Sequence, residues 1–94
     1  MAKIDGFLIS CESVDRNLDT GESVLSGNVQ IIYKDQHFKA NHVIIDQKNK
    51  RAILDGHVVV NNATVEIGGD HIELDYEQNT SKITNGYVKS NNIF

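Results

Sequence analysis

The chain contains no proline, a single cysteine and no long hydrophobic run. Without proline, the turns must come from asparagine and glycine, which both tolerate positive φ. The lone cysteine, Cys11, excludes an internal disulfide and a zinc site built from cysteines. No stretch approaches the roughly 20 apolar residues that a helix needs to cross a bilayer. We therefore expect neither an internal disulfide nor a transmembrane helix.

The chain also lacks a basic excess, because 9 lysines and arginines stand against 13 aspartates and glutamates, for a net charge of −4. A nucleic-acid-binding protein needs a concentrated basic face. The nearest candidate is the run from Lys48 to Arg51. We interpret it as a solvated turn, which is what short charge runs usually are. The composition therefore predicts no nucleic-acid partner.

Motifs that carry catalysis are missing as well: the sequence has no Gly-x-Ser-x-Gly, no P-loop and no His-Glu-x-x-His. A metal site would have to combine His42 with Asp46 and His71 with Asp75. Strand residues four apart in sequence are about 13 Å apart in space, too far to share one ion. Asp15, Asp46 and Asp75 instead stand at equivalent strand ends, where aspartate often starts a turn. We expect no catalytic residue, no metal and no cofactor, and hence no enzyme.

What the sequence does contain is a repeat with a period near thirty residues. Segment 54–60, Leu-Asp-Gly-His-Val-Val-Val, restates segment 25–31, Leu-Ser-Gly-Asn-Val-Gln-Ile, at a spacing of 29. Segment 69–75, Gly-Asp-His-Ile-Glu-Leu-Asp, restates segment 40–46, Ala-Asn-His-Val-Ile-Ile-Asp, at the same spacing. A further copy begins at Thr84. A repeat over nearly the whole chain indicates stacked copies of one supersecondary unit.

The hydrophobic pattern predicts β-strands and almost no helix. Leu25, Val29, Ile31 and Tyr33 share one parity, which is the pattern of a strand with one buried face. Short polar segments separate such runs, as hairpin turns do. The expected strands are Phe7–Val14, Ser23–Tyr33, His37–Asp46, Arg51–Val60, Thr64–Asp75 and Lys82–Ser90.

The parity of the apolar positions reverses inside two of these strands. Phe38 and Ala40 precede the reversal and Val43 and Ile45 follow it, and segment 64–75 reverses at the equivalent place, next to Gly69. A strand keeps one face inward across such a reversal only through a bulge or a sharp bend. Small residues such as alanine and glycine fit a tight bend. We expect both strands to turn a corner.

These patterns predict an all-β protein with one domain over residues 1–94. The favoured architecture is an antiparallel β-jelly roll, a curved two-sheet roll of six strands built from the thirty-residue repeats. The alternative is a right-handed parallel β-helix, which would suit a carbohydrate-acting or metal-dependent enzyme. Its repeats are usually much shorter, about six to nine residues, and it needs more coils to bury its apolar face.

The order of the motifs resembles the OstA-like domain of Gram-negative lipopolysaccharide transport. That domain occurs in the periplasmic bridge protein (LptA) and at the N-terminus of the outer-membrane assembly protein (LptD). Leu25-Ser-Gly-Asn-Val29 and Leu54-Asp-Gly-His-Val58 carry its Gly-x-Val element. Segments 40–46 and 69–75 carry its bend element, Ala/Gly-Asn/Asp-x-apolar. The resemblance spans nearly the whole chain.

The resemblance implies a V-shaped β-jelly roll that carries the acyl chains of lipid A in an apolar groove, for delivery across the periplasm to the outer membrane. The implied partners are lipopolysaccharide, other lipopolysaccharide-transport proteins that pair through edge strands, and further copies in a head-to-tail homo-oligomer. The chain is short for a full bridge protein. Both a small bridge and an N-terminal module of the assembly protein therefore stay open.

The resemblance assigns the inward-facing apolar residues to the lipid groove, although the same residues would serve as plain core. Tyr33 and Tyr76, which each have one polar end, are expected at the rim. The alternative function is a structural module that assembles by edge-strand pairing without binding lipid. The expected groove residues are Val29, Ile31, Phe38, Val43, Ile45, Leu54, Val58, Val60, Ile67, Ile72 and Leu74.

Overall fold

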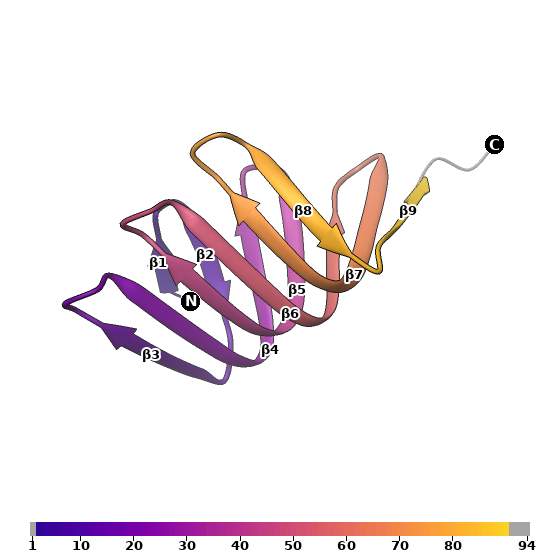
Figure 1. Ribbon diagram of the computed structural model, residues 1–94. Helices are drawn as coiled ribbons and strands as arrows, with labels where there is room; N and C mark the ends of the chain where they lie inside the picture. The colour runs from indigo at the N-terminus through magenta and orange to yellow at the C-terminus, as the bar shows by residue number, and fades with distance from the viewer. Residues whose placement is uncertain (1, 91–94) are drawn as a thin grey trace.

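The chain folds into one antiparallel β-sheet that bends sharply along a line across its strands (Figure 1). The computed structural model describes the backbone of residues 2–90 and the side chains of residues 3–90. No helix in this range is long and apolar enough to pass through a membrane. The sheet has nine strands: β1 (Ala2–Ile4), β2 (Phe7–Ser10), β3 (Ser13–Asn17), β4 (Glu22–Tyr33), β5 (Gln36–Asp46), β6 (Arg51–Asn61), β7 (Val65–Asp75), β8 (Thr80–Thr84) and β9 (Tyr87–Ser90).

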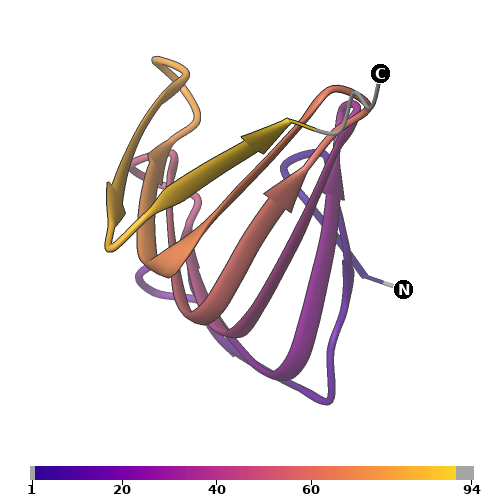
Figure 2. The same cartoon turned by 90° about the vertical axis from the view of Figure 1, so that its right-hand side faces the viewer.

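The four long strands β4 to β7 run through both halves of the bent sheet, and Figure 2 shows the halves as two arms of a V. Arm A consists of β3, β8 and segments 22–26, 42–46, 51–55 and 71–75. Arm B consists of β1, β2, β9 and segments 29–33, 36–40, 58–61 and 65–69. Every strand pair in the described range is antiparallel, which confirms the predicted architecture and excludes the parallel β-helix.

The bend is built from bulges at the same level of successive strands. β4 inserts Gly27-Asn28 opposite a single residue of β5, Asn41, and β6 inserts Gly56-His57 opposite a single residue of β7, Asp70. These inserted residues all have positive φ, which glycine adopts freely and which Asn and His adopt more readily than most residues. β7 crosses the bend with one residue, Asp70. The corner predicted for β5 and β7 is confirmed, and β4 and β6 share it.

Gly68 and Gly69 are small because other strands pass close to them. A Cβ at Gly69 would lie 2.8 Å from the backbone oxygen of Thr84 and 2.9 Å from a methyl group of Ile83. A Cβ at Gly68 would lie 2.4 Å from the ring of Tyr87. The two glycines therefore let the β8–β9 connection cross over β7 at the bend.

The core fills the space between the arms. Its buried members among the described residues come from β1, β2 and the four long strands, and none is more than 6% exposed. Towards β8 and β9 the packing becomes thinner, because Ile83 is half-buried and Val88 is 72% exposed. The buried hydrophobic residues are Ile4, Phe7, Ile9, Leu25, Val29, Ile31, Phe38, Ala40, Val43, Ile45, Ala52, Leu54, Val58 and Ile72.

The expected strands agree with β4 to β7 within a few residues, but the two outer ones were wrong as single strands. The predicted strand Phe7–Val14 is β2 and the start of β3, and the predicted strand Lys82–Ser90 is part of β8 and all of β9. In both places the strand ladder is interrupted where the chain passes from one arm to the other. Between β2 and β3, the Glu12 N–H still donates to the backbone carbonyls of Ser26 and Gly27 at the bend. The β1 strand was not expected.

The turns of arm A begin with hydrogen bonds from backbone N–H groups to Asp or Asn side chains. Asp46 and Asp75 each accept a hydrogen bond from the backbone N–H three residues later, at 3.2 and 3.0 Å, as predicted. The same prediction for Asp15 is wrong, since Asp15 lies inside β3. Asn17 starts that turn instead and accepts a bond from the N–H two residues later at 2.9 Å.

We expect Gly69→Ala to lower the free energy of unfolding by about 1–3 kcal/mol, the usual cost of overpacking. The added methyl group would collide with the backbone of β8, which cannot turn away. Gly68→Ala is the matched control, because its methyl group meets only the far end of the exposed Tyr87 ring, and we expect a loss below about 1 kcal/mol. Urea unfolding followed by circular dichroism measures both. Equal losses would contradict this account of Gly69.

Candidate functional site

The inner faces of the two arms form an apolar slit, which is the candidate site. Cross-strand pairing aligns one continuous row across arm A: Val14, Leu25, Val43, Leu54, Ile72 and Ile83. The corresponding row of arm B is Ile9, Ile31, Phe38, Val60, Ile67 and Val88. Neighbouring strands lie about 4.8 Å apart, so each row is an unbroken apolar strip that crosses the whole arm.

The residues predicted to line a groove lie along this inner face, and most are covered by their neighbours. Val60, Ile67 and Leu74 are half-buried. The others are at most 5% exposed: Val29, Ile31, Phe38, Val43, Ile45, Leu54, Val58 and Ile72. The slit in this conformation is therefore filled by its own side chains. Contact with a lipid stays a prediction for each of these residues.

The groove residues expected from the sequence leave out several members of the inner face. Phe7, Ile9 and Leu25 are at most 2% exposed and belong to the same core. Ile83 extends the arm A row to the half-buried end of the slit. It follows Leu54 by 29 residues, so the repeat period alone was a sufficient signal to find it.

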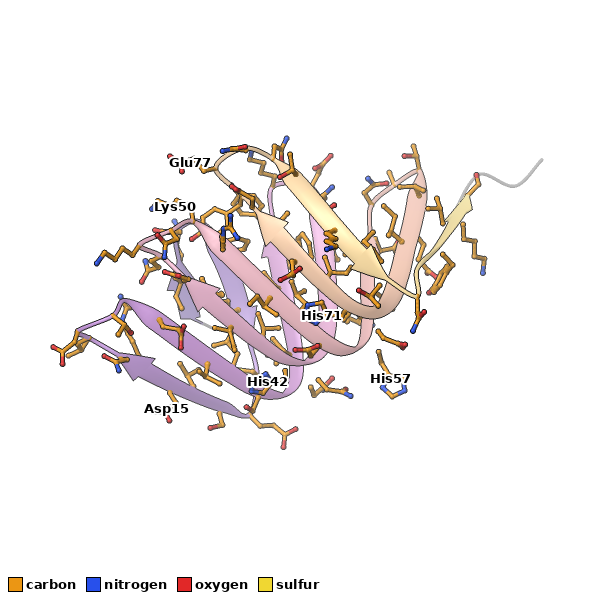
Figure 3. All side chains as sticks on the ribbon, in the orientation of Figure 1. Asp15, His42, Lys50, His57, His71 and Glu77 are labelled. Carbon is orange, nitrogen blue, oxygen red and sulfur yellow. The ribbon has the colours of Figure 1, made fainter. Side chains whose placement is uncertain are left out.

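A polar cluster joins the rims of the two arms. Asp5, in the β1–β2 turn of arm B, accepts hydrogen bonds at its Oδ2 from Lys50 Nζ at 3.0 Å and from the Tyr76 hydroxyl at 2.8 Å. Its Oδ1 accepts a third bond from Gln47 Nε2 at 3.1 Å. The three donors belong to the rim of arm A, where Figure 3 labels Lys50 at the β5–β6 turn. We call Asp5, Gln47, Lys50 and Tyr76 the rim clasp.

An aromatic cluster lies next to the rim clasp. The Phe7 ring stacks on Tyr33 with centroids 4.3 Å apart and meets Tyr76 edge-on at 5.0 Å. Both tyrosines lie at the rim, as expected from the sequence. Asp5 and Gly6 have positive φ, the conformation of a tight Asp-Gly hairpin turn. This turn places the Asp5 carboxylate over the mouth of the slit.

The rim clasp shifts the pKa of two of its members in opposite directions. Burial alone would raise the pKa of Asp5, but the hydrogen bonds from Lys50, Tyr76 and Gln47 outweigh it and hold the pKa below its ordinary 3.8. Burial first, and then the bond to Asp5, raises the pKa of Tyr76 above its ordinary 10.0. The stabilisation from Asp5 is therefore present above pH 3.8 and lost as the pH falls through the lower folded value. That from Tyr76 is present below pH 10.0 and lost at higher pH.

Ser23 is a polar residue inside the slit. Its side chain is fully buried beside Ile45, near the rim of arm A. Its Oγ has no hydrogen-bond partner among the described residues. A buried hydroxyl without a partner costs about 1–3 kcal/mol. In the described part of the chain, the closed slit therefore contains an unsatisfied hydroxyl group at Ser23.

The histidines that suggested metal sites lie along the bend instead (Figure 3). His71 Nδ1 pairs with Asp55 Oδ1 on the neighbouring strand, not with Asp75. His57 Nδ1 lies 3.2 Å from Asn41 Nδ2. Within the described residues, no three histidine, cysteine or carboxylate side chains gather closely enough to hold a metal ion. The chemistry that the site offers is apolar contact, with polar groups at its rim.

We expect Asp5→Asn to lower the free energy of unfolding by about 1 kcal/mol at neutral pH. Asparagine keeps the preference for positive φ but loses the ion pair with Lys50 and one acceptor oxygen. The difference from the wild type should vanish well below pH 3.8, because protonated Asp5 loses the same interactions. Urea unfolding at neutral and acidic pH measures it. A difference that persists unchanged in acid would contradict the assignment of the lowered pKa to these bonds.

Comparison with known proteins agrees with this geometry. The family model described as LptA/(LptD N-terminal domain) LPS transport protein matches residues 37–93, more than half of the chain. A search of curated proteins found no match. The matched segment takes in nearly all of β5 and the whole of β6 to β9, so it includes strands of both arms and the half-buried end of the slit. The chain therefore belongs to the family of LptA/LptD N-terminal domain lipopolysaccharide transport proteins.

Proposed function

We propose that the chain binds lipopolysaccharide without catalysing a reaction, and that the acyl chains of lipid A enter the slit between the arms. The observation that carries the proposal is the continuous apolar inner face of a V-shaped sheet in a member of this transport family. An acyl chain needs a dry apolar surface that extends in one direction. The rows of both arms supply such a surface.

The energetics allow an acyl chain to compete with the packed core. Each CH₂ group removed from water contributes about 0.8 kcal/mol, so ten of them contribute about 8 kcal/mol. A domain of this kind is stable by only about 5–15 kcal/mol in total. Partial separation of the arms can therefore be offset by lipid burial. The half-buried end, at Val60, Ile67 and Leu74, is where the least core contact has to be given up.

We propose that the module works in the periplasm, as the family membership suggests, and that it hands lipid on to proteins of the same fold. Its described edge strands support such pairing, because every residue of β3 and residues 87–89 of β9 are exposed. An exposed edge presents unpaired backbone groups that another strand can bind. The expected neighbours are other lipopolysaccharide-transport proteins or a second copy of this chain.

A photoreactive residue at Val60 is expected to capture purified lipopolysaccharide, whereas the same residue at Val59 is not. The two valines are adjacent on β6 and both are half-buried, but Val60 faces the slit and Val59 lines hollows on the outer face. Irradiation followed by immunoblotting for lipopolysaccharide measures capture. Equal labelling at the two positions would contradict the proposal and favour a structural module that binds no lipid.

Self-association is expected to depend on the apolar residues at the two ends of the slit. Val88→Lys on β9 and Val14→Lys on β3 should each weaken association at least tenfold, because each places a charge where the core of a neighbour would continue. Val59→Lys adds the same charge to the outer face of a central strand and is the control. Sedimentation over a concentration series measures all three. An effect as large for Val59→Lys would contradict pairing through the edges.

A further inference from the structure

We propose that the rim clasp is a gate over the slit and that Asp5 is the residue that holds it shut. The proposal rests on the lipid-binding function proposed above, and it names the element that has to move before an acyl chain reaches the buried part of the slit. Asp5 is bonded to three residues of the opposite arm. The β1–β2 hairpin thus ties the two rims together above the packed interior.

The hairpin has a short backbone ladder, and its side chains Ile4, Phe7 and Ile9 also hold it in the core. β1 has three residues and β2 has four. β2 pairs with β4 at three positions, from Leu8 to Ser10, whereas β4 and β5 pair along nearly their full length. Separation of the two rims breaks the clasp bonds and the edge contact between Phe7 and Tyr76, and it leaves the bulges of the bend in place. Local opening of this kind occurs in the least stable parts of a fold.

The bonds of the clasp can be exchanged for bonds to water. The side chains of Lys50 and Asp5 are 41% and 23% exposed, and a hollow of about 410 Å³ beside them is lined by Asp5, Tyr33, Lys50, Tyr76 and Glu77. Polar groups at such a surface lose little when they part, because solvent replaces their partners. The clasp is therefore strong enough to set the closed state as the resting one and weak enough to open.

Ser23 gives an independent reason for an open state. In the closed slit its Oγ is buried and has no partner among the described residues. Ser23 is paired with Ile45, which is fully buried and precedes the β5–β6 turn that carries Gln47 and Lys50. Opening at this rim would expose the hydroxyl to water or to a polar ester or hydroxyl group of the lipid. Asp5 and Ser23 therefore act in opposite directions, since Asp5 favours closure and Ser23 favours opening.

The test compares the reactivity of two buried cysteines in the absence of lipid. Ile45→Cys and Val43→Cys are each made in a Cys11→Ser background, and both sites are 0% exposed on the same strand. Residue 45 pairs with Ser23 close to the rim, whereas residue 43 pairs with Leu25 closer to the bend. If the clasp is a gate, residue 45 reacts with a thiol reagent faster than residue 43 and with little dependence on urea, because local opening exposes little surface.

Four further variants test whether Asp5 favours the closed slit and Ser23 favours the open one. Asp5→Asn should raise the rate at residue 45 about fivefold, with its low urea dependence unchanged, and Ser23→Ala should lower that rate. Asp35→Asn removes the same charge from the β4–β5 turn and should change neither rate. Gly69→Ala, which destabilises the fold away from the clasp, should raise the rate at residue 43 only.

The outcomes separate the gate from the proposed function. Equal rates and equal urea dependence at residues 43 and 45 would overturn the gate, as would an unchanged rate at residue 45 in Asp5→Asn. Lipopolysaccharide capture at Val60 would still support the function in that case. If Asp5→Asn opens residue 45 but no position captures lipopolysaccharide, the gate stands and the lipid-binding proposal fails. A photoreactive residue can also be placed at position 45. If it captures more lipopolysaccharide in the Asp5→Asn variant than in the wild type, and capture at Val60 is maintained, the result supports both the gate and the lipid-binding function.

Discussion

The structure depends on one constraint: every long strand must bend at the same level of the sheet. A sharp bend in a strand needs extra residues or an unusual backbone conformation. Here the two-residue crossings Gly27-Asn28 and Gly56-His57 alternate with the one-residue crossings at Asn41 and Asp70. Because equivalent strands recur every 29 residues, the bends stay aligned from strand to strand. The V shape follows from that alignment, and so does a slit whose inner rows continue without a break.

The same rows must serve as the core of a small domain and as the proposed lipid surface. With the slit closed, the residues near the bend are buried as in any core, and Leu25, Val43 and Leu54 are at most 1% exposed. Towards β8 and β9 the packing thins, so that Ile67, Leu74 and Ile83 are half-buried. This gradient reconciles the two roles. In the proposed function, the closed end supplies stability, and the thinly packed end supplies the apolar surface for an acyl chain.

The sequence predicted the repeat, the antiparallel architecture and the inward positions, because alternation and period report directly on which face is buried. It did not show the bulges of β4 and β6, since two inserted residues leave the parity of Leu25 and Val29 unchanged. It also missed the split of the outer strands, where alternation continues while pairing changes arm. The rim clasp could not be predicted from the sequence for a different reason. Asp5 and Tyr76 are hydrogen-bonded but 71 residues apart in the sequence, and no local sequence pattern indicates a contact between two turns.

The chemistry of the rim explains why a closed slit can still open. Apolar residues at the rim would join the core, and separating the arms would then cost about 25 cal/mol for each Å² exposed. A polar clasp concentrates the closing interaction in a few bonds that water can replace. The buried Ser23 hydroxyl works against closure from within. The balance between the two lies at the rim, so the arms can part there while the bend, held by the bulges of the long strands, stays intact.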